Sequence, residues 1–259
     1  MVFRADRVLL GRGHFMPQRL VPTITSSLIA MCILATSVPA VELVALAPIR
    51  DNTLFEREDG SRSSGAGMFL FSGMNSDSTA RRAVLAFDVS AIAADAVIDS
   101  VFLEIHVSRV NNESSEPLSV HRLLESWGEG ASDSGAGGGG ATSETGDATW
   151  IHRFYPDQDW SNPGGNFVST ASAMTSTTAP GVYVLSGDGL AEDVRSWIAD
   201  PGTSHGWLLR GDESEPTTAR RIDSRENTDP QSHPKLIVYF TPAIDPVIEA
   251  SWGKVKARF

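Results

Sequence analysis

Five charged side chains crowd the stretch ARRIDSRE, residues 219–226. If Ile222 faces a core, the two-residue period of a strand places Arg221, Asp223 and Arg225 together on the opposite face. This charged ladder can form ion pairs across strands, or its guanidinium groups can bind the carboxylates of an acidic ligand. We favour the ion pairs, because exposed ion pairs are common and contribute little energy.

Two aromatic residues, Tyr155 and Trp160, lie in or beside the polar segment DQDWSN, residues 157–162. Their rings could stack on a sugar, because a sugar ring has an apolar face and a polar rim. The alternative is that both rings cover a core beneath a long loop. The segment itself resembles an oxygen-rich calcium loop, but it lacks the glycine and the distal glutamate of an EF-hand, so we interpret it as a turn.

Catalytic motifs are absent from the sequence. GAGGGG, residues 135–140, has the spelling of a dinucleotide-binding loop without the strand and helix that such a loop needs. The histidines lack the spacing of a zinc site, and no serine lies in a G-x-S-x-G turn. Asp223 and Glu226 could act as paired carboxylates in glycoside cleavage, although carboxylates beside Arg225 more often form ion pairs.

Short β-strands have to position these side chains. Runs of β-branched and aromatic residues, separated by Gly, Ser, Asn and Pro clusters, are typical of an antiparallel sandwich. Alternating apolar residues predict one buried face for each of the strands in 82–89 and 97–110. The full set of expected strands is 41–48, 68–73, 82–89, 97–110, 118–126, 148–155, 181–186, 206–211, 219–226 and 235–240.

One segment, GLAEDVRSWIADPG, has the period of a helix, and its apolar residues at that spacing are Leu190, Val194, Trp197 and Ile198. We expect Asp188 to be its N-cap and the helix to plug one end of the sandwich. By contrast, residues 128–147 are too rich in Gly, Ser and Thr to bury side chains. They predict a mobile surface loop.

The first forty residues have the layout of a secretory signal peptide, with a basic start at Arg19, an apolar run over 28–34 and a small-residue site at Val38-Pro39-Ala40. We therefore assign 1–40 to a signal peptide, with translation starting at Met16. The apolar run is shorter than a membrane-spanning helix, so no integral membrane segment is expected after cleavage. The protein should be secreted, either extracellular or held at the cell surface.

The net charge of −11 for the whole chain becomes about −14 without residues 1–40, which hold four arginines and one aspartate. A negative field of this size disfavours nucleic acid and anionic membranes as partners. The only cysteine, Cys32, lies in the signal segment, so disulfides are not expected in the mature chain. Residues 41–241 carry no repeat or linker and form one expected domain.

Several segments together resemble the DNRLRE domain proteins, also described as carbohydrate-binding module family 96. The resemblance spans roughly residues 48–241, and the chain keeps only Ser224-Arg225-Glu226 of the six-residue string that names the family. The matching segments, in chain order, are DNTLFEREDGSRSSGAGMFLFSG, RRAVLAFDVSAI, AVIDSVFLEIHV, SVHRLLESWGEG, DATW, PGGNF, the helix with GWLLRG, and IDSREN before PKLIVYF.

The resemblance implies an all-β fold, an antiparallel two-sheet β-sandwich of jelly-roll type with one short helix. It also implies a secreted module that binds polysaccharide without catalysis, with acidic glycans such as alginate among the ligands and calcium as a frequent structural ion. Two alternatives stay open. The chain could be a structural or adhesive cell-surface protein that binds other proteins, or a polysaccharide lyase or hydrolase.

Two sites follow from this resemblance. Calcium would bind Asp51, on the first strand, and Asp223, near the last, where a jelly roll brings its termini together. Uronate carboxylates would bind a set of guanidinium groups from neighbouring strands, formed by Arg225 with Arg81, Arg82, Arg153 or Arg210.

The tail, residues 242–259, has a different character. Its apolar residues fall on one helical stripe with a basic end. A frayed terminus, or a helix packed on the sandwich, is the interpretation we rank first. The alternative is an export or surface-retention signal that an envelope partner reads.

Overall fold

The computed structural model describes residues 40–243. The expected signal peptide lies outside the described residues except for residue 40, and the expected tail lies outside them from residue 244 onward. Between residues 40 and 243, no helix combines the length and the hydropathy that a bilayer span requires.

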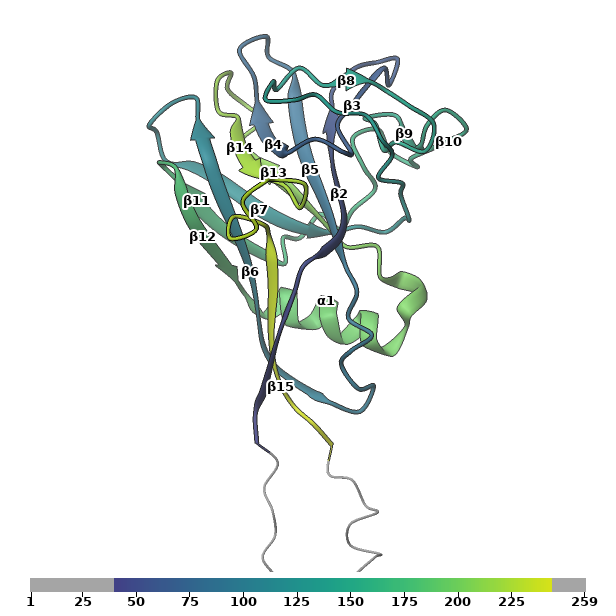
Figure 1. The fold of residues 1–259 in the computed structure, drawn as a ribbon, viewed down its shortest axis with the longest axis vertical. Helices are drawn as coiled ribbons and strands as arrows, with labels where there is room; N and C mark the ends of the chain where they lie inside the picture. The colour runs from purple at the N-terminus through teal and green to yellow at the C-terminus, as the bar shows by residue number, and fades with distance from the viewer. Residues whose placement is uncertain (1–39, 244–259) are drawn as a thin grey trace, which may run out of the picture. The chain divides into compact units, whose positions relative to one another are not determined.

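The described residues form a mostly antiparallel β structure in which one large sheet curls over on itself (Figure 1). Neighbours in this sheet follow the order β1-β15-β6-β14-β4-β5-β13-β7-β11, with β12 also paired to β6 and β2 to β5. Its strands are β1 (Glu42–Leu46), β2 (Pro48–Phe55), β4 (Phe69–Met74), β5 (Ala80–Phe87), β6 (Val97–Val110), β7 (Glu116–Arg122), β11 (Ala173–Thr177), β12 (Gly181–Ser186), β13 (Trp207–Gly211), β14 (Arg220–Asp223) and β15 (Lys235–Thr241).

Two small ribbons and one helix complete the described residues. Strand β3 (Arg62–Ser63) pairs with β8 (Ala141–Thr142), and β9 (His152–Phe154) pairs with β10 (Gln158–Asp159). Helix α1 (Asp188–Ala199) is followed by a 3-10 turn over Pro201–Thr203. The prediction that an all-β chain carries a single helix is therefore confirmed within residues 40–243.

Strand β4 joins the two arms of the curled sheet. Residues 69–72 pair with β14, whereas Gly73 and Met74 pair with the start of β5. Gly73 has a φ of +109°, and a Cβ at this position would lie 2.9 Å from the carbonyl oxygen of Thr218. Only glycine tolerates both conditions, so this residue allows the sheet to turn from one arm to the other.

The main core fills the space between the two arms. On β6 the predicted alternation is confirmed, because Leu103, Ile105 and Val107 are fully buried while Glu104 and His106 are only half-buried. The predicted helix closes this core with Leu190, Ala191, Val194 and Trp197, while Ile198 is only partly buried against it. The expected cap is wrong. The N-cap is Gly187, without a side-chain hydrogen bond, and Asp188 is the first helical residue.

A second core lies on the other face of β5, so this strand is buried on both faces. Val84 and Ala86 pack there with Leu54, Leu208, Trp127 and Trp160. The expectation that residues 128–147 bury nothing is also wrong. Ser132 and Asp147, at 1% and 0% exposure, are buried, because β8 pairs with β3 and hydrogen bonds tie the segment to residues 60–66.

Candidate functional site

The charged ladder of the sequence separates into three different environments. Ile222 is fully buried, as predicted. The guanidinium of Arg221 stacks 3.9 Å above the ring of Phe69, and Asp223 contacts Nδ1 of His106 at 2.6 Å. Strand β14 ends at Asp223, so Arg225 lies in the following turn. The expected ion pairs form only in part: Asp223 pairs with His106 on the neighbouring β6, and Arg225 pairs with Glu129 and Glu226. Arg221 forms none among the described residues, and no ion pair links the three side chains to one another, so they do not make a lattice.

Arg225 instead joins a group of acids from three distant segments. Its Nε and Nη2 donate to the two carboxylate oxygens of Glu129, at 2.8 and 2.9 Å. Its backbone N–H donates to Oδ2 of Asp51 at 2.8 Å. Oxygens of Asp51, Glu129 and Glu226 all lie within 4.8 Å of one another, and we call these three residues the acidic cluster.

Two oxygens of the acidic cluster have no hydrogen-bond donor. Oδ1 of Asp51 and Oε2 of Glu226 are buried and unpartnered among the described residues. Burial raises the pKa of Asp51 well above its ordinary value, and the charge of Glu226 raises it further. Burial also raises the pKa of Glu226, against the opposing charge of Arg225. Buried carboxylates in this arrangement need a shared proton or a cation.

Polar side chains beneath the acidic cluster hold it in place. Asn52 is fully buried, and its Nδ2 donates to the backbone oxygens of Glu129 and Ala148, at 2.7 and 3.3 Å. A Cβ on Gly65 would lie 1.7 Å from the same backbone oxygen of Glu129. Glycine is therefore required where residues 51–65 meet residues 128–148.

The predicted pairing of Asp51 with Asp223 as calcium ligands is wrong in one member. Asp51 does belong to a group of acids, but its neighbours are Glu129 and Glu226. Asp223 lies outside that group because its carboxylate pairs with His106 on the outer face of the sheet. Sequence reasoning missed Glu129, because no local pattern connects a glutamate in a glycine-rich segment to residues 78 positions earlier.

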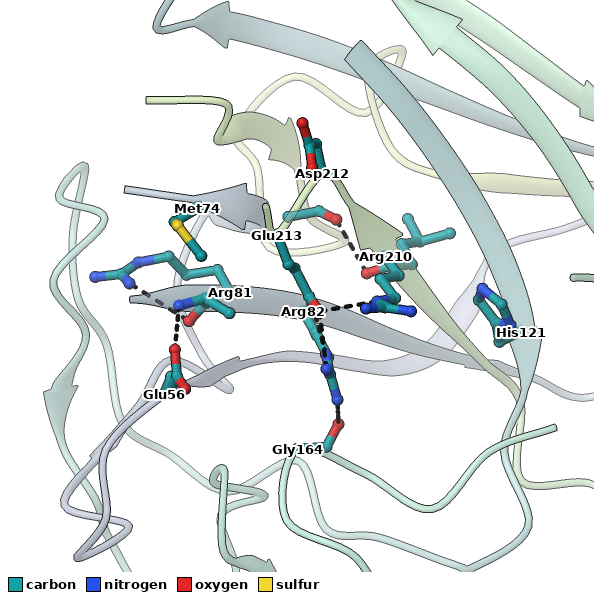
Figure 2. A network of polar contacts seen from close by, with 12 residues as sticks. Glu56, Met74, Arg81, Arg82, His121, Gly164, Arg210, Asp212 and Glu213 are labelled. Atoms are coloured by element: carbon teal, nitrogen blue, oxygen red, sulfur yellow. Dashed lines mark hydrogen bonds and ion pairs between the residues drawn. The ribbon is translucent and has the colours of Figure 1, made fainter. Parts of the chain in front are cut away.

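Arg82 and Arg210 converge on one half-buried acid, Glu213 (Figure 2). Arg82 donates to both oxygens of Glu213, at 2.7 and 2.9 Å, and to the backbone oxygen of Gly164 at 2.7 Å. Burial raises the pKa of Glu213, but the hydrogen bonds and charges of Arg82 and Arg210 outweigh it and lower the pKa overall. Both guanidinium groups are therefore already engaged by the single charge of Glu213.

Arg81, the preceding residue of β5, points away from Glu213 in Figure 2 and is buried on the other face of the strand. Its Nη1 donates to the backbone oxygen and the hydroxyl of Thr79, both at 2.6 Å, and its Nε donates to the backbone oxygen of Gly138 at 3.0 Å. Burial lowers the pKa of Arg81 to about 10. No carboxylate forms an ion pair with it among the described residues.

Arg81 lies at the centre of an arginine-lined depression. Two hollows, of about 160 and 550 Å³, share Asn75, Arg81, Arg109, Asn111 and Gly138 and so form one groove. We call it the arginine groove. Its other charged lining residues are Arg220 and Arg221 at one end, and Arg57 and Asp77 at the other.

Arg153, Tyr155 and Trp160 lie apart from this groove. Trp160 is only 4% exposed and donates from Nε1 to the backbone oxygen of Thr149 at 3.0 Å. It is a core residue, so the alternative to sugar stacking is confirmed for it. Tyr155 is half-buried with its ring edge-on to His152, and Arg153 donates to the backbone oxygen and hydroxyl of Ser126.

Comparisons with known proteins leave the family open. Neither a scan against protein-family models nor a search of curated proteins returned a match. The function therefore has to be argued from the arginine groove and the acidic cluster.

Proposed function

We propose that the protein is a secreted, non-catalytic module of DNRLRE type that binds an acidic polysaccharide. In this proposal the curled sheet is a jelly-roll sandwich, and the ligand lies in the arginine groove. The observation that carries the proposal is the charge of the groove: five arginines and one aspartate line it in a chain whose net charge is −11.

The groove offers different contacts to the two kinds of group on a uronate chain. Arg57 and Arg109 are exposed, and their guanidinium groups make no hydrogen bond among the described residues, so these forks are free for carboxylates. Asn75 and Asn111 line the same floor, and amides suit hydroxyl groups. Arg81 is held by backbone contacts, so it is already ordered before a ligand binds.

Arg109→Gln tests the proposal. We expect gels containing alginate or polygalacturonate to slow the migration of this variant less than that of the parent. Gels containing neutral glucan should slow neither protein. The difference should shrink as salt rises, because exposed charges are screened. Arg195→Gln is the matched control, since it removes the same charge from the exposed side of α1. Equal retardation of both variants and the parent would reject the groove as the site.

We also propose that the acidic cluster holds a structural calcium ion. Its support is the set of three carboxylates with two buried, unpartnered oxygens, because calcium takes oxygen ligands. The ion would join residues 51, 129 and 226 and so stabilise the fold without taking part in chemistry. The response of melting to calcium, developed in the Discussion, tests this assignment.

A second candidate, adhesion to a protein partner, is favoured by exposed apolar residues on β12. Val182 and Val184 are 61% and 50% exposed, and β12 hydrogen-bonds to β6 alone among the described strands. A strand with a free edge and an apolar face can pair with another chain. If the mature protein recovers envelope proteins but no glycan, and a Val182→Ser and Val184→Ser double variant loses them, the adhesive function replaces the first proposal.

A further inference from the structure

A cavity lies at the end of α1, away from the residues assigned so far. It has a volume of about 470 Å³, within the range of small-molecule sites. We call it the helix-end cavity. Its polar lining comes from Arg50, Asp88, Ser90, Trp197 and Ser204. Most of its wall is apolar, from the start of β2, the β5–β6 connection and the end of α1: Ile49, Phe87, Val89, Ile92, Ile198 and Pro201.

Arg50 forms no ion pair among the described residues, although Asp88 lines the same cavity. Its Nε is buried and has no acceptor, and no hydrogen bond or ion pair is made by its guanidinium within residues 40–243. It stacks 4.8 Å from the ring of Trp127. Burial lowers its pKa, against the charge of Glu129. Both oxygens of Glu129 are already bound by Arg225, so Glu129 does not neutralise Arg50.

Trp197 is a second orphaned donor in the same wall. Its ring is fully buried, 4.6 Å from that of Trp207, and its Nε1 has no acceptor among the described residues. The other buried tryptophans differ: Trp127, Trp160 and Trp207 each donate to an oxygen, at 2.9, 3.0 and 2.7 Å. A buried donor without an acceptor is costly. Nε1 of Trp197 has no surface open to the cavity, so the indole is a reporter in its wall, and the guanidinium of Arg50 is the group that calls for an acceptor from outside the chain.

We propose that the helix-end cavity binds a small carboxylate with an apolar body. The carboxylate accepts from the guanidinium of Arg50, and the apolar body fills the space among Ile49, Ile92 and Ile198, against the ring of Trp197. A free sugar fits this wall less well, because the apolar lining leaves most of its hydroxyl groups without partners. This site is separate from the arginine groove and does not depend on glycan binding.

Asp88 sets the limit of affinity at this cavity. Its carboxylate is exposed, lines the cavity and accepts the backbone N–H of Ser90 at 2.9 Å. A bound carboxylate is repelled by this charge. Asp88→Asn keeps an oxygen for Ser90 and removes the repulsion, so it should tighten carboxylate binding by about two- to fivefold at low salt.

Phenylacetate and its neutral amide, phenylacetamide, are the probes. Titration of the ¹⁵N-labelled full chain should move the indole N–H signal of Trp197, which a Trp197→Phe sample identifies by its loss. We expect phenylacetate to bind and the amide to bind more weakly. Arg50→Gln should weaken the binding of phenylacetate by at least about tenfold, because a charge-assisted hydrogen bond is lost.

The controls separate this site from the groove. Arg109→Gln should leave phenylacetate binding unchanged, and Arg50→Gln should leave retardation by acidic glycans unchanged. The proposal is overturned if phenylacetate leaves the Trp197 signal in place, or if the amide binds as tightly as the acid. Asp88→Asn keeps the test decisive should Arg50→Gln fail to fold, since unchanged or weaker binding in this exposed-site variant also overturns it.

Discussion

Replacing Asp51 by asparagine tests two properties of the acidic cluster: the loss of folding stability caused by its buried negative charges, and the proposed binding of calcium. The pKa of Asp51 is raised by burial and by Glu226, so the folded protein holds this proton to a higher pH than the unfolded chain does. A group of this kind stabilises the fold fully below its unfolded pKa, and the contribution is lost as pH rises through the folded pKa. When a chelator removes free calcium, the folding stability of the parent should therefore fall more between pH 4 and pH 8 than that of Asp51→Asn.

Calcium should reverse this loss at high pH. Binding to the folded state alone stabilises it by about 2.7 kcal/mol at a hundredfold excess over the Kd. For a domain of this size, each kcal/mol raises Tm by about 2–4 °C. Calcium should then raise the Tm of the parent by roughly 5–10 °C at pH 8 and much less at pH 4, where the carboxyl groups are protonated.

Thermal melting followed by circular dichroism measures both effects. Asp51→Asn keeps an oxygen that accepts the N–H of Arg225 but removes one charge from the acidic cluster, so calcium should shift its Tm little. The matched control is Asp95→Asn, at an exposed position outside the cluster. If calcium raises the Tm of Asp51→Asn as much as that of the parent, the cation site is refuted. If the two proteins lose stability in parallel from pH 4 to pH 8 in chelator, the electrostatic reasoning is refuted as well.

Further outcomes follow from single contacts. Arg225→Ala should lower Tm by about 2–4 °C, because a partly exposed ion pair contributes roughly 1 kcal/mol, and should leave retardation by acidic glycans intact, since Glu129 already occupies the guanidinium. Gly65→Ala should abolish the calcium shift of Tm by displacing Glu129, whereas Gly139→Ala, where a Cβ meets nothing within 4 Å, should preserve it. Leu103→Ala should cost about 2–5 kcal/mol in urea unfolding. Deletion of residues 243–259 should change neither Tm nor localisation if the tail is a frayed terminus, the interpretation ranked first; release of the truncated protein from the envelope would instead identify the tail as a retention signal.

Strict alternation made some elements predictable. Strands β6 and β12 have the predicted bounds, since β-branched and aromatic residues recur there with a period of two. Helix α1 was predictable from its buried stripe. Strand β2 was missed apart from its first residue, because the buried stretch that includes Asp51 and Asn52 reads as polar. Strand β11, with the sequence AMTST, has too few apolar residues to be recognised.

The candidate site was harder to predict from the sequence than the strands, because tertiary contacts decide which charged side chains form ion pairs. Nothing in the sequence distinguishes Arg82 and Arg225 from Arg109. In the structure, Arg82 binds a glutamate 131 positions away and Arg225 binds one 96 positions away. Trp160 lies on a segment of turn residues and still enters the second core. Composition predicts a solvated loop at 128–147, whereas single buried hydrogen bonds determine its path.

What satisfies each guanidinium is the strongest guide to function in this acidic chain. Arg82, Arg210 and Arg225 are bound by Glu213 or Glu129. Arg81 and Arg153 form no ion pair among the described residues, but backbone and hydroxyl oxygens accept from their guanidinium groups. The guanidinium groups of Arg109, in the arginine groove, and Arg50, in the helix-end cavity, have neither kind of partner among the described residues. The two sites differ in surroundings, one polar and one apolar, and this difference is why we assign them to a polyanionic chain and to a small apolar acid.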